Sequence, residues 1–259
     1  MKTRILSGLI MLPLLVILYL GGYVLFAACL VIGIMGVAEF FNGFHALKIR
    51  PNFATAVISA IALYVINICT DKAEWYMLWF FGVVLASLLY LFSIEKRNLA
   101  DAMATITGIF YVVFFSFHVT LVDQTEYGIL VWLIVITAFG TDIMAYFSGM
   151  ALGRHKLCPK ISPTKTIEGS IGGILGSVIL SGLFGHFFAP EIMVHCIVIG
   201  ILGGIVSQFG DLTASIFKRK MGIKDYGNLI PGHGGILDRF DSVLFTGPMV
   251  YYYIVLIIA

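Results

Sequence analysis

Charged side chains are scarce in this sequence: Asp, Glu, Lys and Arg make up 12% of its 259 residues, whereas 60% are hydrophobic. A soluble globular protein of this size needs more polar surface than that. The formal net charge is only +2, and no basic tail or RNA-binding motif is present, so no nucleic-acid partner is expected. The four cysteines form no CxxC pair and have no histidine at zinc spacing. These absences argue against an aqueous α/β enzyme and against a zinc site.

Long apolar runs take the place of charge. The hydrocarbon core of a bilayer is about 30 Å thick, so a helix needs roughly 20 apolar residues to cross it, and each span must satisfy its own backbone hydrogen bonds. We therefore predict an all-α, polytopic integral membrane protein with about nine transmembrane helices. The predicted spans are 5–20, 22–43, 52–70, 74–93, 101–122, 127–150, 167–188, 191–215 and 236–258.

The first apolar run is short, and Lys2 and Arg4 precede it as in a signal peptide. The run continues past the usual length of the apolar region of a signal peptide, so we interpret it as an uncleaved first helix. The Gly21-Gly22 pair separates it from the second run. A single tilted helix over 5–43 is the alternative, and it would change the number of spans by one.

Basic residues predict the orientation, because cytoplasmic loops are enriched in Lys and Arg. If the N-terminus is inside, every Lys and Arg except Lys72 falls on the inner side. We therefore expect a cytoplasmic N-terminus, an outer C-terminus and an odd number of spans. The long inner loops are then 150–166 and 216–235, which offer polar surface on the side where nucleotides are found.

The stretch 211–241 holds most of the charge of the C-terminal part. Its acidic residues are Asp211, Asp225, Asp238 and Asp241, its basic residues are Lys218, Arg219, Lys220, Lys224 and Arg239, and Gly232, Gly234 and Gly235 lie beside His233. Carboxylate oxygens suit Mg²⁺, while basic side chains and glycine N–H groups suit phosphate. A helix that begins near Gly235 would place Asp238 and Asp241 on one face of its first turn. Asp211 can join them only if the intervening loop folds back.

A second group of polar residues lies in 140–173. Asp142 is predicted to lie inside a membrane helix, where an ionisable residue is costly and is a functional candidate; a structural pair with Lys or Arg is the alternative. Residues 162–169 are interpreted as a turn that leads into a helix. The free N–H groups of that helix could hold phosphate, with Lys165 adding charge, although Ser-Pro is also an ordinary helix start.

Both stretches resemble the phosphatidate cytidylyltransferases, also called CDP-diacylglycerol synthases. The matching residues are Ser215, Lys218-Arg219, Lys224-Asp225, Ile230-Pro231, His233-Gly234-Gly235, Asp238-Arg239 and Asp241 in the first stretch, and Thr141-Asp142, Gly153-Arg154, Ser162 to Gly169 and Gly172-Gly173 in the second. The family more often has Thr-Gly where this chain has Ile143-Met144, directly after Asp142, whose expected role is with the metal or the nucleotide. The N-terminal half matches only in hydropathy.

The resemblance implies transfer of CMP from CTP to phosphatidate, with Mg²⁺ as cofactor and a second, monovalent ion as a further expectation. It also implies a bacterial plasma (inner) membrane and an active site that faces the cytoplasm. The expected metal ligands are Asp211, Asp238 and Asp241; the expected catalytic residues are Asp211, Asp238, Lys218, Arg219, Lys224 and Arg239; and the expected substrate-binding residues are Ser162, Lys165, Thr166, Ser215, His233, Gly234, Gly235 and Asp142.

The two halves of the chain are expected to differ in role. Residues 1–125 would form a scaffold with contacts for a homodimer, and 126–259 the catalytic region. A CTP-dependent lipid or polyprenol kinase is an alternative function, and a secondary transporter is another, because Asp142 and Glu39 could mark an ion path. Glu39 and Asp101 lie near inner helix ends, where they could act as lipid-gate or as structural carboxylates.

Overall fold

The computed structural model describes residues 13–229 and 234–259, and the described residues are mostly helical. Six of the helices in these ranges are long and apolar enough to cross a membrane. Two shorter helical stretches, Phe53–Cys69 and Val243–Ile258, are also apolar. The predicted helical, polytopic membrane fold is therefore confirmed. The predicted first span, 5–20, lies partly outside the described residues, so the total of nine and the orientation of the termini stay predictions.

The chain folds as two compact units. The first comprises the described residues up to Phe117 together with 220–239, and the second comprises 118–219 and 240–259. The N-terminal half therefore shares a unit with most of the charged stretch that follows α9. The predicted division at 125/126 concerned function, and it stays a prediction.

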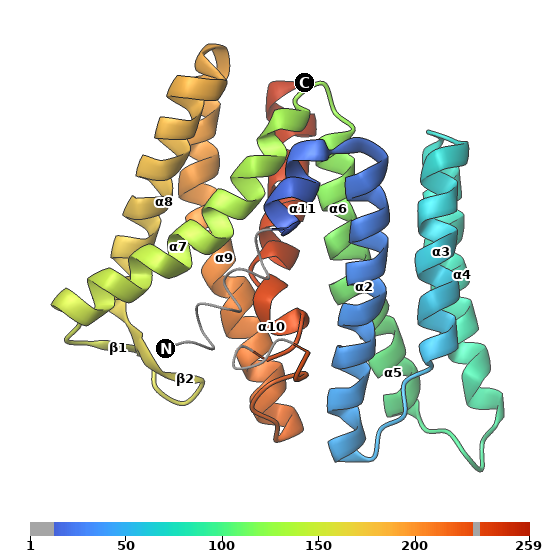
Figure 1. Cartoon of the computed structure of the whole chain (residues 1–259). Helices are drawn as coiled ribbons and strands as arrows, with labels where there is room; N and C mark the ends of the chain where they lie inside the picture. The colour runs from blue at the N-terminus through green and yellow to red at the C-terminus, as the bar shows by residue number, and fades with distance from the viewer. Residues whose placement is uncertain (1–12, 230–233) are drawn as a thin grey trace. The chain divides into compact units, whose positions relative to one another are not determined.

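Helices of the first unit lie side by side, as α2, α3 and α4 do in Figure 1. A π-helical segment, η3, joins α5 to α6 in one continuous helix. Two single 3₁₀ turns follow α2 and α4. The bounds are α2 Gly22–Phe44, η1 His45–Leu47, α3 Phe53–Cys69, α4 Ala73–Leu89, η2 Tyr90–Phe92, α5 Leu99–Gly108, η3 Ile109–Phe114 and α6 Phe115–Asp123.

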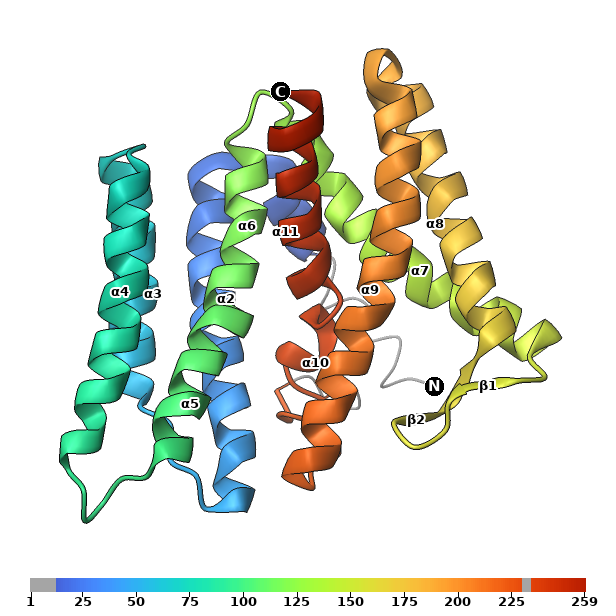
Figure 2. The same cartoon turned by 180° about the vertical axis from the view of Figure 1, so that it is seen from behind.

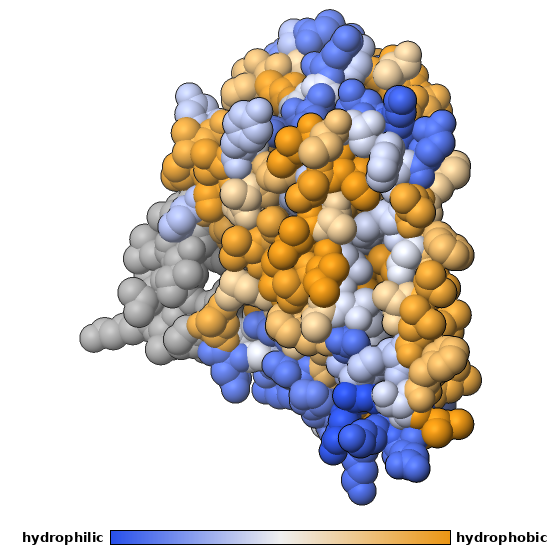
Figure 3. Space-filling view, turned by 90° about the vertical axis from the view of Figure 1, so that its right-hand side faces the viewer, coloured by the Kyte–Doolittle hydropathy of each residue, from blue (hydrophilic) through white to orange (hydrophobic). Residues whose placement is uncertain are grey.

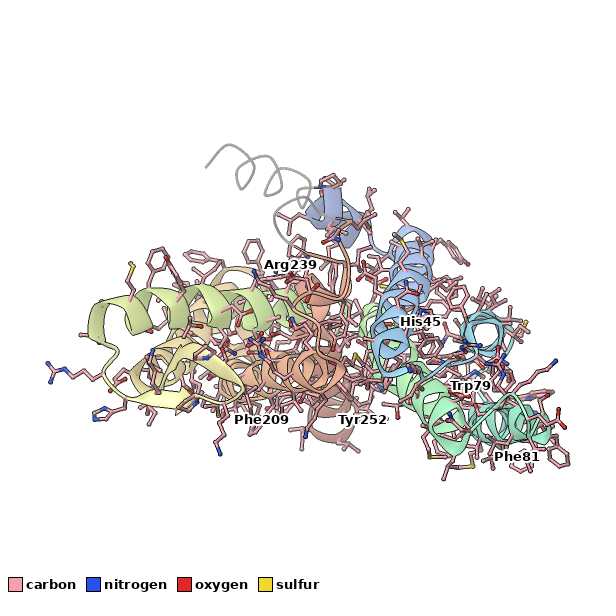
Figure 4. The ribbon with its side chains drawn as sticks, turned by 90° about the horizontal axis from the view of Figure 1, so that it is seen from below. His45, Trp79, Phe81, Phe209, Arg239 and Tyr252 are labelled. Carbon is pink, nitrogen blue, oxygen red and sulfur yellow. The ribbon has the colours of Figure 1, made fainter. Side chains whose placement is uncertain are left out.

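Helix α4 has a buried face and an exposed face, and both carry apolar side chains. The Trp79 indole N–H donates to the Ser59 carbonyl of α3 at 2.8 Å, and the indole ring stacks on Phe114. Phe81, by contrast, is 60% exposed and lies at the outer edge in Figure 4.

In the space-filling view, apolar side chains gather over the middle of the face and hydrophilic ones toward both ends (Figure 3). Such a distribution suits contact with lipid.

Asp101 shows how the loops of the first unit are anchored. It forms a capping box with Asn98 at the start of α5. The Asp101 N–H donates to Asn98 Oδ1, and the Asn98 N–H donates to Asp101 Oδ2, each at 3.0 Å. The same carboxylate accepts the Arg50 N–H at 2.7 Å, and only 2% of the residue is exposed. Of the two interpretations of Asp101, the structural one therefore applies.

The second unit contains long helices and one small sheet. In Figures 1 and 2, α8 and α9 lie side by side, and β1 pairs with β2 in an antiparallel hairpin. The bounds are η4 Gly128–Leu130, α7 Val131–Leu152, β1 Lys156–Cys158, β2 Ser162–Thr166, α8 Ile167–Phe188, η5 Pro190–Ile192, α9 Met193–Met221, α10 Leu237–Phe240, α11 Val243–Tyr253 and η6 Ile254–Ile258. The last two residues of α9 and the first three of α10 belong to the first unit.

Glycines let α7 and α8 approach each other closely. A Cβ atom at Gly169 would lie 2.9 Å from the Ala145 carbonyl oxygen, and one at Gly173 would lie 2.9 Å from the Thr141 carbonyl oxygen. Side chains at these positions would push the helices apart, as at the small-residue interfaces of membrane proteins. The close approach brings Asp142 of α7 near the first turn of α8.

Two predicted loops are partly regular structure. Residues 162–166, interpreted as a turn, form β2, and Thr166 then caps α8 by accepting the Gly169 N–H at 3.1 Å. Helix α9 continues through Met221, beyond its predicted end at 215, so Lys218, Arg219 and Lys220 are helical and not in a loop. No glycine or proline interrupts 211–221, and basic residues favour a helix C-terminus. Gly222, at φ +73°, ends the helix.

Candidate functional site

The second unit encloses a cavity of about 410 Å³ between α7, the hairpin, α8 and α9. Four of the predicted site residues line this cavity, namely Asp142, Lys165, Thr166 and Asp211. The polar residues that line the cavity are Asp142, Tyr146, Thr164, Lys165, Thr166, Ser170, Gln208 and Asp211. The volume lies within the range of small-molecule sites. The cavity is therefore the candidate site within this unit.

Lys165 and Asp211 form an ion pair in this cavity. Their side chains are 27% and 25% exposed, so the pair is largely shielded from water. Burial lowers the pKa of Lys165 from its usual value, and the nearby carboxylates of Asp142 and Asp241 oppose that shift by stabilising the ammonium. Three carboxylates predicted from the sequence thus act on one lysine.

A pair of uncharged polar residues lies next to the ion pair. The Ser170 hydroxyl donates to the Gln208 side-chain oxygen, and the Gln208 amide donates to the Ser170 carbonyl at 3.2 Å. Neither residue was predicted. Gln208 stands one helical turn before Asp211 in an otherwise apolar stretch of α9, and that spacing is the signal that could have identified it. The pair ties α8 to α9 beside the cavity.

Glu168 holds the hairpin against the start of α8. Its carboxylate accepts the Arg154 N–H at 3.0 Å and the His155 N–H at 3.2 Å, and it lies 2.6 Å from His155 Nδ1. At the other end of the hairpin, Arg219 Nε lies 3.4 Å from the Ile161 carbonyl oxygen. These contacts position β2, and hence Lys165, relative to α9.

The first unit holds a second group of predicted residues around α10. Asp238 Oδ2 accepts the Tyr226 N–H at 2.8 Å and the Gly235 N–H at 3.0 Å, and 7% of Asp238 is exposed. Gly234 has φ +87°, a conformation that favours glycine. The Gly235 N–H, expected to bind phosphate, thus donates to a carboxylate in this structure, and its substrate role stays a prediction.

Helix α10 begins near the predicted place but is only four residues long. Asp241 therefore follows it, at the break before α11, and accepts the Ser242 N–H at 2.8 Å. The expectation that Asp238 and Asp241 share the first turn of one continuous helix is not met. Pro248, inside α11, lies too far along the chain to explain the break, and we have no physical account of it.

The remaining predicted residues are distributed over both units. Ser215, Lys218 and Arg219 lie on α9 in the second unit, Lys224 and Arg239 belong to the first, and His233 lies outside the described residues. Of the predicted metal ligands, Asp211 and Asp241 belong to the second unit and Asp238 to the first. Within each unit, no three His, Cys, Asp or Glu side chains of the described residues lie close enough together to hold a metal ion. The proposed metal and substrate roles remain predictions.

Comparison with known proteins gives a family match over nearly the whole chain. The sequence model of the cytidylyltransferase family matches residues 2–257. A phosphatidate cytidylyltransferase of Staphylococcus epidermidis is 35% identical over 96% of this chain and 97% of its own length. A phosphatidate cytidylyltransferase of Synechocystis sp. is 33% identical over 93% of this chain and 92% of its own length. The one of Bacillus subtilis is 38% identical over 59% of this chain and 57% of its own length.

Proposed function

The chain belongs to the cytidylyltransferase family, and on that premise we propose that it transfers CMP from CTP to phosphatidate. The products are CDP-diacylglycerol and pyrophosphate. Relatives named for this activity align with more than nine-tenths of the chain. Apolar helices suit a substrate whose acyl chains stay in the bilayer. The enzyme is a nucleotidyltransferase of phospholipid biosynthesis.

The observation that carries the proposal is the ion pair of Lys165 and Asp211 in a partly buried cavity next to Asp142. A shielded ammonium group attracts phosphate oxygens more strongly than an exposed one. Carboxylates beside it would repel CTP unless a cation neutralised them. The cavity therefore fits a nucleotide that arrives together with a metal ion.

The carboxylates fit Mg²⁺ by their chemistry. The Lys165 ammonium already lies against Asp211, so this carboxylate attracts a cation in the structure, and hard oxygen ligands are the ones that Mg²⁺ prefers. We assign the ion to Asp211 and Asp238, and assign Asp241 to a second, monovalent ion. When bound, the metal neutralises phosphate charge.

The chain's basic residues then bind and orient the substrates. An oxygen of the phosphatidate phosphate attacks the α-phosphorus of CTP, and the bond from that phosphorus to the β-bridging oxygen breaks to release pyrophosphate. No strong base is needed, because a phosphate monoester has a second pKa of about 6. Arg239 Nε is buried and has no hydrogen-bond partner among the described residues, which supports its role with an anion.

The other predicted residues are assigned to the substrates and to the leaving group. Arg239, Lys218, Arg219 and Lys224 are assigned to phosphatidate and to the departing pyrophosphate. The residues assigned to substrate binding are Asp142, Ser162, Lys165, Thr166, Ser215, His233, Gly234 and Gly235. Electrostatic stabilisation of this kind is often the largest contribution to phosphoryl-transfer catalysis.

We further propose that the site faces the cytoplasm of a bacterial plasma membrane. CTP and Mg²⁺ are supplied by the cytosol, whereas the phosphatidate head group lies at the inner surface of the bilayer. The basic residues of the predicted inner loops support this orientation. A homodimer is a separate proposal, and crosslinking in native membranes tests it: a solely monomeric species would reject it.

Labelled CTP tests the reaction directly. Purified protein in detergent receives phosphatidate, Mg²⁺ and CTP labelled at the α-phosphate, and EDTA serves as control. Label that enters the organic phase and is lost with EDTA supports Mg²⁺-dependent cytidylyl transfer. Label that enters lipid only from γ-labelled CTP would support a lipid kinase instead, and no transfer by a folded preparation would favour transport.

A further inference from the structure

We propose that Glu39, on α2 in the N-terminal half, is a positioning residue that orders the loop bearing Asp238. The inference rests on the proposed function in one respect, namely that Asp238 takes part in the reaction. Glu39 stands 197 and 198 residues before the two residues that it contacts. All groups involved belong to the first unit.

The Glu39 carboxylate caps the start of α10. Oε1 accepts the Ile236 N–H at 3.0 Å, and Oε2 accepts the Leu237 N–H at 2.8 Å. Both acceptor atoms are thus used on two successive amides, directly before Asp238. A helix of four residues has little stability of its own. A carboxylate at its N-terminus satisfies N–H groups that the helix leaves open and is favoured by the helix dipole.

Two glycines make room for this carboxylate. A Cβ atom at Gly235 would overlap the Glu39 carboxylate, and one at Gly227 would lie 2.6 Å from Glu39 Oε1. The Gly235 N–H donates to Asp238 Oδ2, so the same glycine contacts both acidic residues. The loop is therefore shaped around Glu39 on one side and Asp238 on the other.

One face of α2 holds the whole segment. A Cβ atom at Gly36 would lie 3.9 Å from Leu237 Cδ1, and the ring of Phe40 lies 6.0 Å from that of Tyr226 between centroids. Gly36, Glu39 and Phe40 are three and four residues apart, the spacing of one helical face. Tyr226 also donates its N–H to Asp238. Displacement of Glu39 is therefore expected to reach Asp238 through both the loop and Tyr226.

A purely stabilising role is the simpler alternative, and a matched variant separates the two. Asp101, which is more deeply buried than Glu39, is another carboxylate of the first unit that caps a helix and accepts a distant backbone N–H. Its contacts do not include the loop 234–237. Asp101→Asn should therefore lower thermal stability as Glu39→Gln does, without a change at Asp238.

The experiment compares Glu39→Gln and Asp101→Asn with the unchanged protein in detergent. Hydrogen–deuterium exchange is followed over 234–240, and initial rates are measured with CTP and phosphatidate varied separately. The glutamine side chain keeps one acceptor oxygen, but its NH₂ group then faces one of the two backbone N–H groups, of Ile236 or of Leu237, and cannot accept from it. We expect Glu39→Gln to raise exchange over 234–240 and to lower kcat by about tenfold or more, since small misplacements at a reacting centre are costly.

Gly227→Ala is a second variant that displaces the carboxylate without removing its charge, and it should raise exchange over the same residues. Normal exchange over 234–240 in Glu39→Gln would overturn the inference, as would an equal loss of kcat in Asp101→Asn. The exchange measurement needs no turnover. Full activity of Asp238→Asn would therefore reject the proposed role of Asp238, whereas normal exchange in Glu39→Gln rejects the inference about Glu39.

Discussion

Lys165, the fourth residue of β2, is paired with Asp211 in the middle of α9. The pair joins two stretches that the sequence pattern indicates separately, 162–169 for phosphate and 211–241 for metal and phosphate together. Because both side chains are mostly shielded, removal of Lys165 leaves the Asp211 carboxylate without its paired cation, whereas removal of Asp211 leaves Lys165 with Asp142 and Asp241. The pair is thus the most direct target for mutation within the second unit.

Replacement of Lys165 by Met should reduce kcat/KM by about 100-fold, because a cation that stabilises phosphate charge is lost. Lys165→Arg keeps the charge and should retain more activity. Initial rates of label transfer from CTP measure both. Lys160→Met is the matched control, since Lys160 is an exposed lysine of the same hairpin. Equal activities of Lys160→Met and Lys165→Met would contradict the proposed role of Lys165.

Asp142→Asn tests whether this carboxylate, which is assigned to substrate binding, also supports the proposed Mg²⁺ ligand Asp211 in the same cavity. It lines the same cavity as Asp211 and favours a cation there. Its loss should raise the Mg²⁺ concentration for half-maximal activity by about tenfold or more, the range typical of residues that support metal ligands. The measurement is a Mg²⁺ titration at saturating CTP. Asp71→Asn, at an exposed position, is the control, and an unchanged Mg²⁺ requirement in Asp142→Asn would show that Asp142 does not support the metal ligands.

Hydropathy alone predicts most of the membrane helices, because the length of an apolar run is a local property of the sequence. The predicted span 167–188 coincides with α8, and 22–43 falls one residue short of α2. The predicted end of α9 at 215 is wrong, because the change from apolar residues to Lys218 and Arg219 indicates the end of a membrane span and not of a helix, and basic residues continue a helix well.

The candidate site was harder to predict because its contacts connect distant parts of the chain. Residue types marked Lys165 and Asp211, but only the fold pairs them. Glu39 remained ambiguous as a lone acidic residue near a helix end, since its partners at 236 and 237 lie in the other half of the sequence. Gln208 carries no charge and so gave no electrostatic signal, despite its spacing from Asp211.

Ser170 and Gln208 should stabilise the second unit cooperatively. Ser170→Ala and Gln208→Ala are each expected to lower the free energy of unfolding by about 1 kcal/mol, as is typical when a hydrogen bond is lost. The double variant should lose less than the sum, because each single change already breaks the shared bond. Unfolding in detergent, followed by circular dichroism, provides the three values. Strict additivity would show that the two side chains do not interact.

Gly173→Ala should destabilise the protein by about 1–3 kcal/mol, the usual cost of overpacking. The new methyl group would lie 2.9 Å from the Thr141 carbonyl oxygen and force α7 away from α8. Gly82→Ala is the matched control: it lies in α4, and outside the neighbouring backbone of that helix no atom of the described residues lies within 4 Å of the added carbon. Alanine there should stabilise the helix by roughly 0.5–1 kcal/mol.

Thermal unfolding in detergent compares the two alanine variants directly. Because α7 carries Asp142 and the first turn of α8 follows Lys165, a wider gap between the helices should also weaken CTP binding and raise the KM for CTP. Gly82→Ala should leave that KM unchanged. If Gly173→Ala matched Gly82→Ala in both stability and KM, the two helices would not require this close contact, and the cavity would have to be held together by the Ser170–Gln208 bonds and the ion pair instead.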